Sequence, residues 1–117
     1  MSEEALSLAH AIVQTLEEKK GEDILLLDLL GVCAFTDYFV ICTGGSERTL
    51  QALAEEVLHR VKVHASPDLP RTEGEASSGW VLLDYGDVIL HLFAPQARAY
   101  YRLEDLWRAG KVLLRLQ

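Results

Sequence analysis

Residues 79–93, GWVLLDYGDVILHLF, constrain the fold of this chain more than any other segment. They are mostly strand-forming apolar residues, interrupted once by Tyr85-Gly86-Asp87, a pattern typical of a β-hairpin. A two-residue loop, at either Tyr85-Gly86 or Gly86-Asp87, sorts the side chains of both strands onto two distinct faces. One face is purely aliphatic and consists of Val81, Leu83, Val88, Leu90 and Leu92. We therefore expect this face to pack in the core.

The opposite face of the hairpin mixes aromatic, aliphatic, acidic and imidazole side chains, namely Trp80, Leu82, Asp84, Ile89, His91 and Phe93. Each taken singly has a structural explanation: Trp80 can close the core, Asp84 and Asp87 can stabilise the turn, and His91 can be a satisfied half-buried histidine. Gathered on one face, they match the composition of an interface, in which aromatic anchors are combined with a few orienting polar groups. We therefore expect an outward docking surface there.

Helix and strand patterns alternate along the rest of the chain. Apolar residues at helical spacing predict a helix that starts at Ser2 and stops near Gly21, and a second helix capped by Ser46. Residues 23–29 and 37–43 are predicted strands, residues 66–79 are the longest predicted loop and are expected to be mobile, and one or two short helices are expected from Pro95. These patterns predict a single α/β domain, a mixed β-sheet flanked by helices, over residues 1–108. Residues 109–117 form a C-terminal tail, either a short strand or a loose end.

The charge of the chain bears on its partners. The formal net charge is −7, and the Lys and Arg residues are scattered, so we expect little direct nucleic-acid binding. An acidic surface suits a basic protein partner. The sequence has no apolar run of membrane-spanning length and no secretory or transit pattern at its N-terminus, so we expect a cytoplasmic protein without a membrane association. Cys33 and Cys42 are interpreted as reduced, small apolar residues.

Three stretches together resemble one family. They are DYFVICTGGSERTLQALAEEV, EGEASSGWVLLDYGDVILHLF and RAYYRLEDLW, in that order and spacing. They resemble the Iojap family, whose bacterial members are the ribosomal silencing factors RsfS, over residues 3–108. The resemblance implies an α/β fold related to nucleotidyltransferases, without their catalytic carboxylates.

The resemblance also implies a function. Members bind the large ribosomal subunit through its protein numbered fourteen, at the face that meets the small subunit, block subunit joining and repress translation when nutrients are scarce. They catalyse nothing known and need no cofactor or metal, and they tend to be homodimers when free. The partner-binding residues that follow from the matched motifs are Trp80, Leu82, Asp84, Tyr85, Asp87, His91, Arg98, Tyr101 and Glu104.

These residues would have different roles at the docking surface. Trp80 and Leu82 would be the apolar anchors. The carboxylates of Asp84, Asp87 and Glu104 would meet Lys or Arg on a basic ribosomal protein. His91 would orient the site, and Arg98 and Tyr101 would border it.

Three other functions remain as alternatives. The segment TGGSERTLQALAEEV also resembles the start of a nucleotidyltransferase site, but Glu55 and Glu56 are helix neighbours that converge poorly on a metal, and the chain has no Asp-x-Asp pair. A metal site from Asp84, Asp87 and His91 would need a register in which the two carboxylates face each other. A generic acidic dimerisation module would use the aromatic-rich segment from Tyr100 to Trp107.

Overall fold

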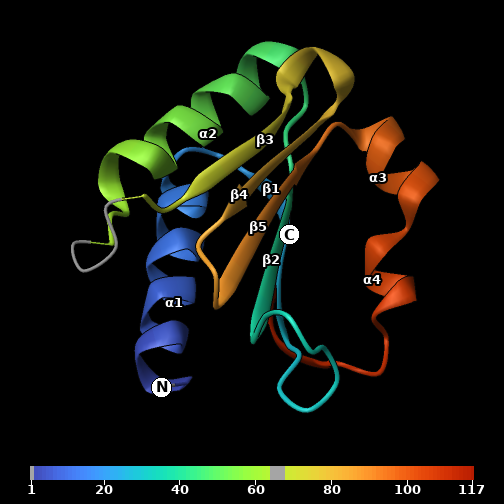
Figure 1. Ribbon diagram of the computed structural model, residues 1–117. Helices are drawn as coiled ribbons and strands as arrows, with labels where there is room; N and C mark the ends of the chain where they lie inside the picture. Colours follow the sequence, from blue (N-terminus) through green and yellow to red (C-terminus); the bar gives the residue numbers. More distant parts are fainter. Residues whose placement is uncertain (1, 64–67) are drawn as a thin grey trace.

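The structure is a computed structural model that describes residues 2–63 and 68–117. Its elements in chain order are α1 (Ser2–Glu18), β1 (Glu22–Asp28), β2 (Tyr38–Thr43), α2 (Glu47–Arg60), β3 (Arg71–Glu75), the 3₁₀ helix η1 (Ala76–Ser78), β4 (Trp80–Asp84), β5 (Val88–Phe93), α3 (Pro95–Tyr101), α4 (Leu103–Leu106) and β6 (Lys111–Leu116) (Figure 1).

The strands form one six-stranded sheet in the order β3-β4-β5-β2-β1-β6. The neighbouring strands β2 and β5 run parallel, and every other neighbouring pair is antiparallel. The predicted class, a single α/β domain with a mixed sheet between helices, is therefore confirmed. Among the described residues, none of the helices is both long enough and apolar enough to cross a membrane.

The β4–β5 hairpin has the two-residue loop that its side-chain pattern predicted. Trp80 pairs with Phe93 and Asp84 pairs with Ile89, so the loop is Gly86-Asp87. The backbone N–H of Tyr85 donates to the carbonyl of Val88 at 2.9 Å and closes the turn. Gly86 has φ of +92°, a conformation that residues with a Cβ rarely adopt, so glycine suits this loop position.

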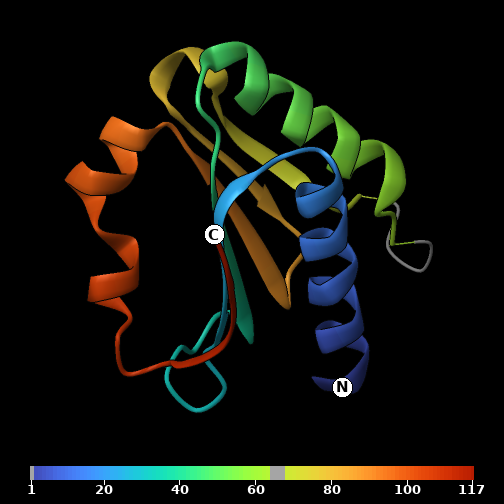
Figure 2. The same ribbon diagram turned by 180° about the vertical axis from the view of Figure 1, so that it is seen from behind.

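The aliphatic face of the hairpin lies in the larger of two hydrophobic cores, as expected. Helices α1 and α2 lie side by side over this face of the sheet. Figure 2 shows both helices in the view turned by 180° from Figure 1. Helix α2 buries Leu50, Leu53, Ala54 and Val57, a spacing that places all four on one side of the helix. The helix starts where predicted, because the Ser46 hydroxyl accepts a hydrogen bond from the backbone N–H of Thr49 at 3.1 Å.

The other face of the sheet has a smaller core and a thinner cover. The buried members of this second core are Leu25, Leu27, Leu29, Phe39, Ile41, Ile89, Phe93 and Leu103. Helices α3 and α4 lie on this side of the sheet, opposite α1 and α2 (Figure 1). Both helices are short, and Trp80, Leu82 and Trp107 at the margin of this core are only partly buried.

Two segments differ from the expectations. Residues 66 and 67 of the expected long loop lie outside the described residues, and the remainder contains the edge strand β3 and the helix η1. Every residue of β3 is exposed, so it lacks the apolar alternation that identifies a strand in a sequence. The end of the chain forms the strand alternative rather than a loose end, because β6 pairs antiparallel with β1. The sheet thus extends beyond residue 108.

Candidate functional site

The half-covered face of the sheet carries a groove of about 280 Å³. Six residues line it, namely Glu73, Gly74, Ser78, Trp80, Leu82 and Tyr101, and we call it the aromatic groove. They come from β3, β4, α3 and the residue that ends η1. It combines two aromatic rings, one leucine and one carboxylate on a surface that solvent reaches.

Trp80 forms the central wall of the aromatic groove. Its ring centroid lies 4.6 Å from that of Tyr101 and 4.9 Å from that of Phe93. Its indole N–H donates a hydrogen bond to Nδ1 of His91 at 3.2 Å. These three contacts hold the indole in one orientation, while its remaining surface stays open beside Tyr101, which is 48% exposed.

His91 lies beneath Trp80 and is only 4% exposed. It occupies the position opposite Leu82 on the neighbouring strand. Burial lowers the pKa of the imidazole to about 3, so the ring is neutral near pH 7. Because Nδ1 accepts the Trp80 hydrogen bond, the single ring proton lies on Nε2. Because its side chain is buried, His91 presents almost no surface to solvent, and its hydrogen bond fixes the orientation of the Trp80 indole.

Tyr85 was expected to bind a partner and does not lie on the docking side. It is 3% exposed, and its hydroxyl donates to the carbonyl of Val61 at 2.7 Å. Burial raises the pKa of this phenol above its usual value. The physical reason is strand alternation, which turns the residue after Asp84 towards the α1 and α2 side. Tyr85 is therefore a core residue in this structure.

Asp84 and Asp87 lie at the turn, at the opposite end of β4 from Trp80. Asp84 accepts a hydrogen bond from the backbone N–H of Gly86 at 2.8 Å, which stabilises the turn. Asp87 is exposed, and its carbonyl accepts from the backbone N–H groups of Asp37 and Tyr38. Since Asp84 pairs with Ile89, it does not face Asp87 across the hairpin, and the carboxylate pair needed for the metal alternative does not form.

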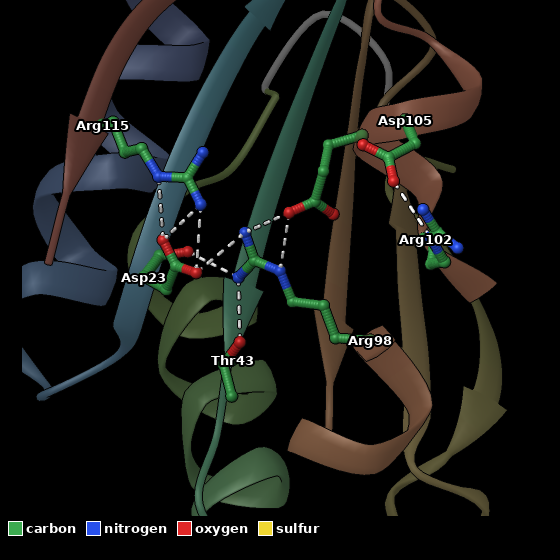
Figure 3. Close-up of polar contacts among 7 residues, drawn as sticks. Asp23, Thr43, Arg98, Arg102, Asp105 and Arg115 are labelled. Atoms are coloured by element: carbon green, nitrogen blue, oxygen red, sulfur yellow. Dashed lines mark hydrogen bonds and ion pairs between the residues drawn. The ribbon is translucent and has the colours of Figure 1, made fainter. Parts of the chain in front are cut away.

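Arg98 was expected to border the docking surface but is 7% exposed. Its guanidinium contacts the Glu104 carboxylate at 3.1 Å, the Thr43 hydroxyl at 2.8 Å and the Asp23 carboxylate at 3.5 Å, and it also donates to the Asp23 carbonyl (Figure 3). Asp23 in turn pairs with Arg115 of β6. Arg98 and Glu104 therefore neutralise each other inside the fold. Neither side chain therefore presents an unpaired charge at the surface of this structure.

An open hollow of about 720 Å³ lies beside this ion-pair cluster, next to the ends of β2 and β5. Ligands of open α/β folds often bind at such strand ends, so the carboxylates here bear on the enzyme alternative. Of the four carboxylates that line the hollow, those of Asp23 and Glu104 pair with Arg98 and that of Asp105 pairs with Arg102. Within residues 2–63 and 68–117, no group of three His, Cys, Asp or Glu side chains is placed to hold a metal.

Glu73 lines the aromatic groove but is absent from the predicted partner-binding residues. In the β3–β4 register Glu73 lies directly opposite Leu82, so both side chains lie on the docking side of the sheet. The matched motif contains Glu73, but the segment was assigned to a loop, and a loop residue has no defined face. A strand assignment for residues 71–75 would place Glu73 on the same face of the sheet as Trp80.

Comparisons with known proteins agree with this fold. The sequence profile described as "Ribosomal silencing factor during starvation" matches residues 2–115. The ribosomal silencing factor RsfS of Halalkalibacterium halodurans is 41% identical over 106 residues, which is 91% of this chain and 87% of that protein. A crystal structure of a Chromobacterium violaceum protein superimposes with a TM-score of 0.80 at 34% identity, covering 96% of this chain and 92% of the other.

A more distant relative comes from mouse. The protein named "Mitochondrial assembly of ribosomal large subunit protein 1" is 31% identical, and the match covers 82% of this chain but 43% of that protein. The profile match spans nearly the whole chain, beyond the last residue that the sequence motifs reached, and the bacterial relatives match over most of their own length. The chain therefore belongs to the RsfS family of ribosomal silencing factors.

Proposed function

We propose that this protein silences ribosomes by docking on the large subunit at the face that meets the small subunit, so that the two subunits cannot join. Its partner there is a basic ribosomal protein, the protein numbered fourteen, and the outcome is repressed translation when nutrients are limiting. Membership of the family supports the silencing role, and the name of the mouse relative connects that protein with the large ribosomal subunit.

The observation that carries the docking proposal is the rigid, half-open aromatic pair of Trp80 and Tyr101. Interface hot spots are commonly aromatic side chains that are ordered before binding, because little conformational entropy is then lost. The hydrogen bond from Trp80 to His91 and the packing on Phe93 supply that order. Blocking assembly needs no chemistry at the surface, so we propose that the protein acts by steric occupation and not as an enzyme.

Truncation of the central anchor tests this proposal. Trp80→Ala removes the wall of the aromatic groove, and loss of a central aromatic anchor typically costs about 2–4 kcal/mol of binding free energy. We expect the affinity for purified large subunits, measured by co-sedimentation, to fall at least about 30-fold. The control His59→Ala lies on the exposed side of α2, on the opposite layer, and is expected to bind like the unchanged protein.

Two outcomes would contradict the docking proposal. One is equal binding of the unchanged protein to large and small subunits. The other is an unchanged affinity of Trp80→Ala for the large subunit, with a circular dichroism spectrum that shows the variant is folded.

The homodimer expected for the free protein belongs to the same proposal. Tyr100 is 79% exposed and Leu106 is 72% exposed, so α3 and α4 present apolar surface next to the aromatic groove. Exposed apolar groups of this size commonly mark association surfaces. A contact here would let a second copy and the ribosome compete for neighbouring residues.

A further inference from the structure

We propose that the aromatic groove receives a cationic side chain of the docked protein, with Glu73 as its counter-ion and the rings of Trp80 and Tyr101 as its walls. The inference rests on the docking function proposed above and names the chemistry of the group that enters the groove.

Glu73 is the carboxylate in the groove that has no competing cation. It lies on the edge strand β3, directly opposite Leu82, and its side chain lines the groove. Within the described residues, Glu73 and its neighbour Glu75 form no ion pair. By contrast, the Glu104 carboxylate pairs with Arg98. The Asp84 carboxylate accepts a hydrogen bond from the backbone N–H of Gly86 and lies 3.9 Å from the Arg71 guanidinium.

The lining of the groove discriminates between possible occupants. A purely apolar side chain would take water away from the Glu73 carboxylate without replacing its hydrogen bonds, which is unfavourable. An anionic side chain would be repelled by Glu73 and Glu75. A Lys or Arg side chain can lay its aliphatic stem on Leu82 and its charged end against an aromatic face and the carboxylate. The combination of rings and one free carboxylate therefore favours a cation.

The position of Glu73 is set by a close backbone contact of the next residue. Gly74 has φ of +81°, and a Cβ added there would lie 2.2 Å from the carbonyl oxygen of Trp80. The two strands can approach this closely because residue 74 is a glycine. At the end of β3, the Ser78 hydroxyl donates to the carbonyl of Glu75 at 2.7 Å and holds η1 against the strand. The backbone of Glu73 is thus held beside β4 before a partner arrives.

The test removes the charge of Glu73 and keeps its shape. Glu73→Gln is expected to weaken binding to purified large subunits roughly two- to fivefold, because it removes the ion pair of an exposed carboxylate and leaves the two rings in place. Its affinity should also depend less steeply on salt concentration than that of the unchanged protein. Glu17→Gln, an exposed residue of α1 with the same change in net charge, should bind like the unchanged protein.

Parallel measurements with Trp80→Ala separate this inference from the docking proposal. If Trp80→Ala loses affinity while Glu73→Gln matches Glu17→Gln at every salt concentration, the groove docks a partner but does not hold a cation, and the inference is overturned. If the unchanged protein shows no binding to large subunits, the docking proposal and this inference fail together. Weakened binding of Glu73→Gln, together with unchanged binding of Glu17→Gln, supports the inference.

Discussion

At the scale of single residues, the imidazole of His91 is enclosed by aromatic rings. Its centroid lies 4.5 Å from that of Phe39, 5.9 Å from Trp80 and 6.1 Å from Phe93. Burial lowers its pKa from about 6.5 in the unfolded chain to about 3 in the folded protein. Below pH 6.5 the unfolded chain therefore binds a proton that the folded protein does not bind. The contribution of His91 to the free energy of unfolding therefore falls as the pH falls from about 6.5 towards 3.

A variant without a titrating side chain measures this contribution. His91→Gln keeps a polar side chain that can accept from Trp80 and removes the titration. Between pH 7 and pH 5, the unchanged protein should lose about 2 kcal/mol more of its free energy of unfolding than His91→Gln loses. Urea denaturation at the two pH values gives the comparison. Equal losses in the two proteins would show that His91 titrates normally in the fold.

At the scale of elements, the edge strand β3 depends on the glycine that touches β4. Gly74→Ala combines a left-handed backbone position with a clash against the Trp80 carbonyl, so we expect it to lower the free energy of unfolding by about 2–4 kcal/mol. Gly31 offers a matched control, since its φ is +79° and a Cβ there would meet nothing within 4 Å. Gly31→Ala should cost only about 1–2 kcal/mol.

Denaturation of the two glycine variants by urea separates the clash from the backbone strain that they share. A Gly74→Ala variant that is no less stable than Gly31→Ala would contradict the close contact between β3 and β4. The same variant should also weaken docking, because displacement of β3 moves Glu73 away from Trp80.

The elements that the sequence predicted are those whose pattern is local. The β4–β5 hairpin has an alternation of side chains with a glycine in its loop, and α2 has an apolar stripe with Ser46 as its cap, so both were found. Strand β3 has no buried residue, so its sequence lacks an apolar pattern, and it is a strand because it pairs with β4. The cover of His91 by Phe39 and Trp80 and the burial of Arg98 also depend on contacts between distant segments. The alternation of side chains can therefore be predicted from the local sequence, whereas the exposure of His91 and Arg98 cannot.

At the scale of the whole molecule, the Arg98 cluster joins the thin helical layer to the sheet. Its guanidinium on α3 contacts Asp23 of β1, Thr43 of β2 and Glu104 of α4 (Figure 3). These contacts hold α3, and with it Tyr101, over the docking side of the sheet. Removal of Arg98 would leave the half-buried carboxylate of Glu104 without its cation, which is costly in a protein interior.

A pair of arginine variants tests the importance of this cluster. Arg98→Met should lower the free energy of unfolding by about 3–5 kcal/mol, or leave the chain unfolded, because it breaks a buried ion pair. Arg102→Met breaks the exposed pair with Asp105 at 3.0 Å and should cost less than about 1 kcal/mol. Thermal and urea denaturation provide the comparison. Similar stabilities for the two variants would show that Arg98 has no special role.

The hydrogen bond between the two rings at the centre of the site has a practical consequence for spectroscopy. The chain contains two tryptophans, and one of them donates its indole proton to a nitrogen acceptor. In a nitrogen-15 labelled sample, that proton should resonate apart from the other indole signal and exchange more slowly with deuterated solvent. The Trp80 indole signal therefore reports directly on the site, and a change in its chemical shift would reveal an occupied groove without a chemically attached probe.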